Sequence, residues 1–135
     1  MNEVPNDLDG LPLAKQNFAY RDIIGQDLWQ AFTPVFGSLT VVGATTYSGR
    51  FRIVGRECQI QVQFSAATSI ASVAGTDYLT LPITAKGLAG AGVMSNVTTN
   101  IAVGVCHVDV TNSRLYLPSQ AASANVFTLA AKYEI

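Results

Sequence analysis

A strict alternation of apolar and polar residues between Cys58 and Phe64 is the clearest pattern in this chain. The apolar positions are Cys58, Ile60, Val62 and Phe64, and the polar positions are Gln59, Gln61 and Gln63. A period of two is typical of a β-strand with one buried and one exposed face. Because paired amides can be buried without stranding a charge, we expect the face of Gln59, Gln61 and Gln63 to form an interface between subunits.

Further strand-sized segments follow one another from Val35 to the end of the chain, separated by turn residues. The predicted strands cover residues 35–42, 46–54, 58–65, 78–81, 101–110, 114–117 and 126–135. Short strands with a turn about every ten residues predict an all-β fold, an antiparallel β-sandwich. A jelly roll is the first expectation for its topology, and an immunoglobulin-like arrangement is the alternative.

The N-terminal part of the chain follows another pattern. Residues 1–12 contain Pro5, Gly10 and Pro12 and show no periodicity. Over residues 13–32, large apolar residues recur at four-residue intervals, which predicts a short amphipathic helix ending before Pro34. We therefore expect an N-terminal arm over residues 1–31 and a β-sandwich domain over residues 32–135.

The arm carries a stripe of large apolar side chains that we expect to attach the protein to a larger structure. These side chains are Tyr20, Ile24, Leu28, Trp29 and Phe32. Two interpretations of Trp29 stay open. It packs the arm against the β-domain, or it docks with its aromatic neighbours onto another protein, since aromatic anchors commonly hold interfaces together.

Two long connections, at residues 66–77 and 82–97, are rich in small residues and are predicted loops. Loops on a β-scaffold often bind ligands. The candidate ligand-binding residues in and near them are Thr68, Ser69, Tyr78, Asn96 and Tyr116. A subunit contact through Leu88, Val93 and Met94 is the alternative use of the second loop.

Charged residues make up only 13% of the chain, about half of the usual ~25%. A surface so poor in charge predicts that other subunits cover much of it. The net charge of −1 and the lack of a basic run argue against nucleic-acid binding. We expect Arg50, Arg52 and Arg56 to form a solvated strand face or a set of interface ion pairs.

No apolar run approaches the ~20 residues of a membrane span, so we expect no membrane insertion. The acidic N-terminus lacks the basic start and apolar core of a signal peptide. We therefore expect the protein to be made in a cytoplasm and not exported by that route.

No group of residues predicts catalysis or cofactor binding. The glycine-rich residues 87–92 lack the Lys-Ser/Thr pair of a phosphate-binding loop. His107 and Asp109 would share a strand face, but a structural role is expected for this single histidine. One histidine and scattered acids do not make a zinc site. Cys58 and Cys106 are expected to be buried free thiols. The expected protein is not an enzyme and holds no metal or cofactor.

Several motifs resemble the β-domain of tailed-bacteriophage virion proteins. They are an aromatic-Thr-Pro segment at residues 32–34, a Tyr-x-Gly-x-aromatic strand at residues 47–51 and a Val-Gly-x-x-Cys turn at residues 54–58. The similarity continues through residues 68–90, 103–119 and 127–135. The resemblance implies a β-sandwich subunit, often a homotrimer, that assembles on a phage particle without enzymatic activity.

The chain is shorter than a typical tail fibre, which favours an accessory subunit of the virion. The expected protein is a capsid decoration (cement) protein, a head fibre or a small tail component, made in the cytoplasm of the host bacterium. Its expected partners are copies of itself and capsid or tail proteins. The alternative is a receptor- or glycan-binding tip of a tail fibre, with a host surface glycan as ligand. A hydrolase of host polysaccharide is a further alternative that lacks a credible pair of acids.

Overall fold

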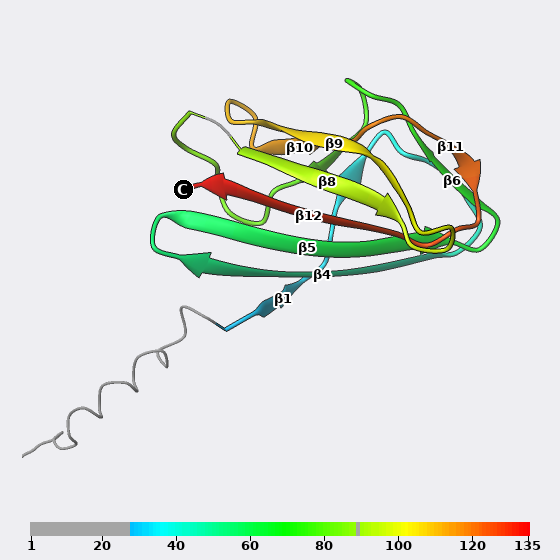
Figure 1. The fold of residues 1–135 in the computed structure, drawn as a ribbon, viewed down its shortest axis with the longest axis horizontal. Coiled ribbons are helices and arrows are strands. Elements are labelled where there is room, and N and C mark those ends of the chain that lie inside the picture. Colours follow the sequence, from blue (N-terminus) through cyan, green and yellow to red (C-terminus); the bar gives the residue numbers. More distant parts are fainter. Residues whose placement is uncertain (1–27, 89) are drawn as a thin grey trace, which may run out of the picture.

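The computed structural model describes residues 28–88 and 90–135, and in these residues all regular secondary structure is β-strand (Figure 1). The predicted all-β fold is therefore confirmed. The strands are β1 (Gln30–Phe32), β2 (Phe36–Gly37), β3 (Thr40–Val42), β4 (Thr45–Val54), β5 (Glu57–Ala66), β6 (Ser69–Ser72), β7 (Tyr78–Thr80), β8 (Gly90–Asn96), β9 (Ile101–Asp109), β10 (Arg114–Tyr116), β11 (Gln120–Ser123) and β12 (Phe127–Glu134).

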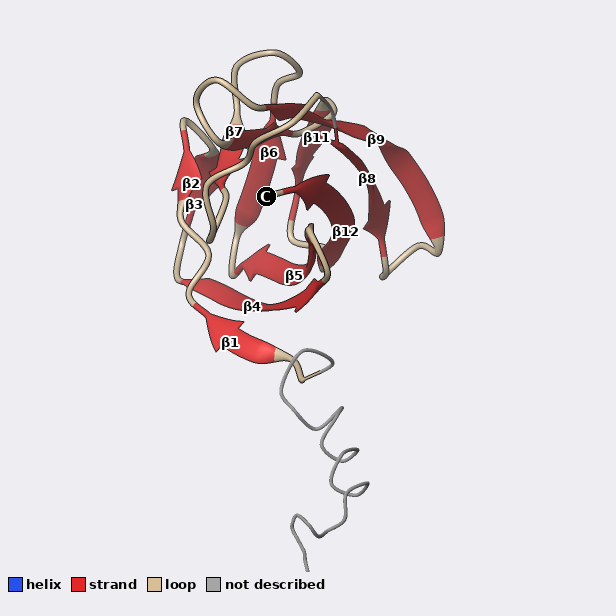
Figure 2. Cartoon of the chain, turned by 90° about the vertical axis from the view of Figure 1, so that its left-hand side faces the viewer, coloured by secondary structure: helices blue, strands red, loops and turns tan. Residues whose placement is uncertain are grey.

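The strands form one large and one small antiparallel sheet. The large sheet has nine strands in the order β1-β4-β5-β12-β8-β9-β10-β7-β2, and the small one has the order β11-β6-β3. The large sheet curls strongly, so that β2 returns towards β4 and β5 (Figure 2). Phe36 on β2 contacts Tyr47 on β4 and Phe64 on β5, with ring centroids 5.1 and 4.9 Å apart. This curled arrangement is consistent with the predicted β-sandwich.

The core lies on the inner face of the curl and is built by the alternating residues of β5 and β12. These two strands pair over their whole common length, from Phe64 opposite Phe127 to Glu57 opposite Glu134. Their inward side chains are at most 8% exposed; they are Cys58, Ile60, Val62, Phe64, Phe127, Leu129, Ala131 and Tyr133. Full burial of a large apolar side chain stabilises the fold by about 1.5–3 kcal/mol, so this pair of strands supplies much of the core.

The predicted strand over residues 35–42 is wrong in one respect, because it is two strands in different sheets. β2 belongs to the large sheet and β3 to the small one. Ser38, between them, has a φ of 66°, a left-handed conformation that no regular strand accommodates. The chain turns at this residue and crosses from one sheet to the other.

Three further strands lie where the sequence predicts none. β6 lies within the predicted loop 66–77, β8 within the predicted loop 82–97, and β11 between two predicted strands. β8 is central, because it pairs with β12 on one side and β9 on the other. The small residues of β8 are needed because β12 lies close against it. A Cβ on Gly92 would lie 2.5 Å from the Ala130 carbonyl oxygen.

The predicted helix over residues 13–32 is wrong at its C-terminal end, where Gln30–Phe32 forms β1 and pairs with β4. Gly49 on β4 makes this pairing possible. A Cβ there would lie 2.9 Å from the Phe32 ring, which also packs edge-on against Phe51 at 5.9 Å. The boundary predicted between residues 31 and 32 falls within β1. Residues 13–27 of that helix prediction, with Tyr20 and Ile24, lie outside the described residues, and residues 28 and 29 are not helical.

Candidate functional site

A row of arginines lies beside the row of glutamines on the outer face of the large sheet. Arg50 is opposite Gln61, and its Nε and Nη2 donate hydrogen bonds of 2.9 and 2.7 Å to Gln61 Oε1. Arg52 Nε donates to Gln59 Oε1 at 2.9 Å. Gln61 and Gln63 are exposed, and Gln59 is half-buried. The expectation of a neutral amide face is therefore wrong, because two guanidinium groups share this face and already use the amide oxygens.

Trp29 packs on these arginines. The guanidinium carbons of Arg50 and Arg52 each lie 4.7 Å from the centroid of its ring. Such cation–π contacts are worth about 0.5–1 kcal/mol each at exposed sites. Trp29 and Phe32 are half-buried against the β-domain, whereas Leu28 is 62% exposed. Among the described members of the predicted attachment stripe, only Leu28 leaves most of its side chain uncovered.

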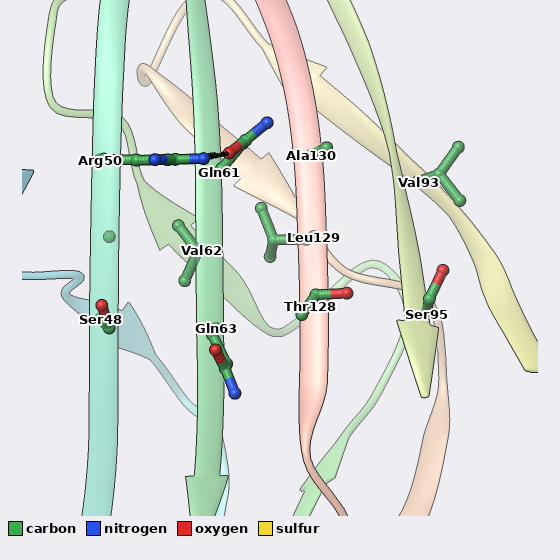
Figure 3. A pocket seen from close by; sticks show the side chains of 11 residues that line it. Ser48, Arg50, Gln61, Val62, Gln63, Val93, Ser95, Thr128, Leu129 and Ala130 are labelled. Carbon is green, nitrogen blue, oxygen red and sulfur yellow. Dashed lines mark hydrogen bonds between the residues drawn. The ribbon is translucent and has the colours of Figure 1, made fainter. Parts of the chain in front are cut away.

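A shallow groove of about 560 Å³ follows the outer face of β12. Figure 3 shows its cause: Thr128 and Ala130 on β12 are short, while Gln61 on β5 and Val93 on β8 stand on either side. A second hollow of about 310 Å³ adjoins it between Trp29 and Ala130. The described part of the chain contains no cluster of three or more His, Cys, Asp or Glu residues that could hold a metal ion.

The hairpin of β8 and β9 exposes four β-branched apolar side chains. Ile101 is opposite Asn96, whose side chain is buried on the inner face, so we define the β8–β9 apolar surface by the other three, Val93, Val97 and Val105. Val93, Val97, Ile101 and Val105 are 50%, 47%, 62% and 71% exposed. Val93 and Val105 lie directly opposite each other, and Ala130 on β12 pairs with Val93. The sequence has no charged residue between Lys86 and Asp109. A grouped apolar surface without charge is typical of a contact with another molecule.

Two of the predicted ligand-binding residues, Tyr78 and Tyr116, come together on β7 and β10. They are opposite each other in register, and their rings pack edge-on with centroids 5.8 Å apart. The Arg114 guanidinium lies 4.0 Å from the centroid of the Tyr78 ring. His107 on β9 is opposite Tyr116. The sequence signalled His107 only as a neighbour of Asp109, and it did not signal Arg114 as part of this cluster.

The Asp109 carboxylate is engaged with the turn that follows β9. It accepts hydrogen bonds from the side chain and the backbone N–H of Asn112, at 2.8 and 3.3 Å. These bonds hold the pKa of Asp109 below its usual value. The carboxylate therefore shapes a turn, which agrees with a structural role and gives no sign of a catalytic pair with His107.

The other predicted ligand-binding residues do not join the tyrosines. Thr68 is exposed beside Gly43 in the turn before β6, and Ser69 is half-buried at the start of β6. Asn96 is buried at the end of β8, where its Oδ1 accepts a hydrogen bond of 3.2 Å from the Thr99 N–H. Asn96 therefore holds the β8–β9 turn and is not free for a ligand.

Cys58 and Cys106 are buried free thiols, as predicted. Burial raises the pKa of Cys106 to about 12 and also raises the pKa of Cys58. Since the thiolate is the nucleophilic form, neither residue is suited to attack a substrate near neutral pH.

No known protein-family model matches the chain, and neither does any curated protein or any solved structure. Residues 28–88 and 90–135 contain no helix long and apolar enough to span a membrane. The likeness to phage virion domains stays a prediction from the sequence motifs.

Proposed function

We propose that this protein is a non-enzymatic structural subunit of a bacteriophage virion. Jelly-roll-like β-domains associate into an oligomer, a trimer by the resemblance, and the N-terminal arm fixes the oligomer to the capsid or tail. The single observation that carries the self-association is the β8–β9 apolar surface. The virion location rests on the sequence motifs of residues 32–135.

The exposed side chains supply a driving force for association. Val93, Val97 and Val105 are each about half exposed or more. Covering the exposed part of each is worth roughly 1 kcal/mol, from the free energy of burying apolar area. The hairpin itself has no charged residue between Lys86 and Asp109 to desolvate, and Lys132, opposite Ala91 on β12, adjoins the surface. A second copy of this chain is a suitable occupant.

The proposed interface is therefore not centred on Gln59, Gln61 and Gln63. That half of the outer face carries the cations Arg50, Arg52 and Lys132, with the acids Glu57 and Glu134 at its end. Burying these charged side chains against a second copy that does not pair them would be costly. The glutamine and arginine rows therefore flank the interface, and β8 and β9 lie at its centre.

The test measures oligomeric state by light scattering and sedimentation on the full chain. The wild-type protein should be a multimer at micromolar concentration, and Val93→Asp should weaken association at least tenfold by placing a charge at the centre of the surface. Val73→Asp is the matched control, since Val73 is 55% exposed and lies outside the β8–β9 apolar surface. Thermal unfolding should show both variants folded. A wild-type monomer, or equal effects of the two variants, contradicts the proposal.

Attachment is tested with the same material. A chain beginning at residue 28 keeps Trp29 and β1, so it should still form the oligomer but lose binding to particles that lack the protein. If the shortened oligomer binds such particles as well as the full chain does, the arm is not the anchor.

A further inference from the structure

A groove of about 590 Å³ lies beside the tyrosine pair, between β9, β10 and the turn that follows β6. Its walls include the Tyr116 ring, the His107 imidazole, Pro118 and Ser119, with Gly75 opposite. The volume falls within the ~300–1,000 Å³ of small-molecule sites. Among the described residues that line the groove, none is charged.

Packing contacts fix the position of the Tyr116 ring on one side of the groove. Tyr116 lies in β10, which pairs with β9 and β7 on its two sides. Its ring packs edge-on against Tyr78, and Tyr78 lies so close over Gly37 that a Cβ there would clash with the tyrosine ring. The Arg114 guanidinium, 4.0 Å from the Tyr78 ring centroid, also contacts that ring. Tyr116 therefore needs little reordering to receive a ligand.

Hydrogen bonds fix the turn after β6, which forms the other side of the groove. The buried Asp77 carboxylate accepts a hydrogen bond of 2.8 Å from the Val73 N–H and closes the turn. The Ala74 N–H donates to Ser119 Oγ at 2.9 Å, which ties this turn to the segment after β10. Because Ser119 Oγ is the acceptor in that bond, its own hydroxyl hydrogen can be donated to a ligand.

We propose that this groove binds a neutral sugar unit of a carbohydrate chain. The apolar C–H face of a pyranose would rest on the Tyr116 ring, an amphipathic surface with a polar end. The sugar hydroxyls would pair with His107, with Ser119 Oγ and with the Tyr116 hydroxyl, each able to donate or accept. None of the described lining residues is charged, and the adjoining Arg114 guanidinium is engaged by the Tyr78 ring and the Tyr116 hydroxyl, which favours a neutral sugar over an acidic one. The site differs from the predicted loop site, because Thr68, Ser69 and Asn96 do not line it.

This site goes beyond the structural role and does not depend on it. Val105 belongs both to the groove and to the β8–β9 apolar surface. Sugar binding and oligomeric state must therefore be measured separately, with variants that change one and leave the other.

The experiment uses the full chain and a panel of neutral hexose and N-acetylhexosamine oligosaccharides. Uronic-acid and sialylated oligosaccharides are the acidic ligands for comparison. Saturation-transfer NMR detects binding, and titration gives Kd. We expect at least one neutral sugar to bind. Tyr116→Ala should weaken it tenfold or more, Tyr116→Phe should retain most of the affinity, and His107→Ala should weaken it several-fold.

Thr80→Ala is the control, since Thr80 is exposed on neighbouring β7 and does not line the groove. It should leave affinity unchanged, and light scattering should show the same oligomer for all four variants. If Tyr116→Ala unfolds, His107→Ala, at an exposed side chain, carries the test. Binding of no neutral sugar, binding of acidic sugars alone, or unchanged affinity in the groove variants overturns the proposal and leaves the structural role standing.

Discussion

Gln61 on β5 takes part in a cross-strand contact with Arg50 on β4, which the pattern of β5 alone does not reveal. Its side-chain oxygen accepts two hydrogen bonds from the Arg50 guanidinium, at 2.9 and 2.7 Å. Because both side chains are exposed, the pair contributes only modestly to the free energy of unfolding. Its contribution depends on the charge of the side chain at position 61. Directly opposite side chains on antiparallel strands contribute about 0.2–1 kcal/mol, with like charges destabilising.

Gln61→Lys should therefore lower the free energy of unfolding by about 0.5–1 kcal/mol, because it places an ammonium group beside Arg50. Gln61→Glu is the matched variant and should leave stability unchanged or raise it slightly. Urea denaturation at low and high salt measures both, and salt should shrink the difference. The oligomer should survive Gln61→Lys, since the proposed interface is centred on β8 and β9. Equal changes in the free energy of unfolding for Gln61→Lys and Gln61→Glu would show that Arg50 does not interact with the charge at position 61.

At the level of elements, β8 is the middle strand of the nine-stranded sheet. It joins β12 to β9 and so connects the two halves of the sheet. Gly92 faces β12 with no room for a side chain, since a Cβ would lie 2.5 Å from both the Ala130 carbonyl oxygen and the Ala131 Cβ. Backbone atoms cannot move aside as the end of a flexible side chain can, so even one methyl group forces the strands apart.

Gly92→Ala should destabilise the protein by about 1–3 kcal/mol, the usual cost of overpacking. Ala91→Ser is the control, because Ala91 is exposed on the same strand. Urea denaturation of both variants gives the comparison. A Gly92→Ala protein as stable as the wild type would mean that β8 does not lie against β12 as described.

Across the whole molecule, the curl of the sheet encloses ionisable groups that remain protonated in the folded state. Cys106 is fully buried, and burial raises the pKa of its thiol from 9.0 to about 12. Burial also raises the pKa of Tyr133, whose hydroxyl donates a hydrogen bond of 2.8 Å to the Ile83 carbonyl. Above pH 9 the unfolded chain binds fewer protons at these groups than the folded protein does.

The free energy of unfolding should therefore be unaffected by these groups below about pH 9 and fall as the pH rises from there towards 12. Cys106→Ala removes one such group, so its stability should decline less steeply between pH 9 and 11. Ala102→Ser, at an exposed position of the same strand, should keep the wild-type slope. Denaturation midpoints at several pH values measure this, and equal slopes for wild type and Cys106→Ala would contradict it.

The fold could be predicted from the sequence where the signal is local. The alternation of Cys58 to Phe64 and of Phe127 to Tyr133 identified β5 and β12, because a strand with one buried face shows period two whatever it packs against. The same rule failed for β8. Gly90 and Gly92 are typical of a loop, and the reason for them lies in β12, a strand distant in the sequence.

The sequence by itself determined that the domain from residue 32 on is built of β-strands, that Gln59, Gln61 and Gln63 face outward and that Cys58 and Cys106 are buried, since these follow from the local pattern of each segment. Only the tertiary structure decided what lies beside those segments. Strand pairing placed Arg50 on Gln61, brought Val93 opposite Val105 and put Tyr78, Tyr116 and His107 in adjacent strands. The physical reason is that a surface or a groove is a property of register between strands, and register depends on how the whole sheet closes around its core.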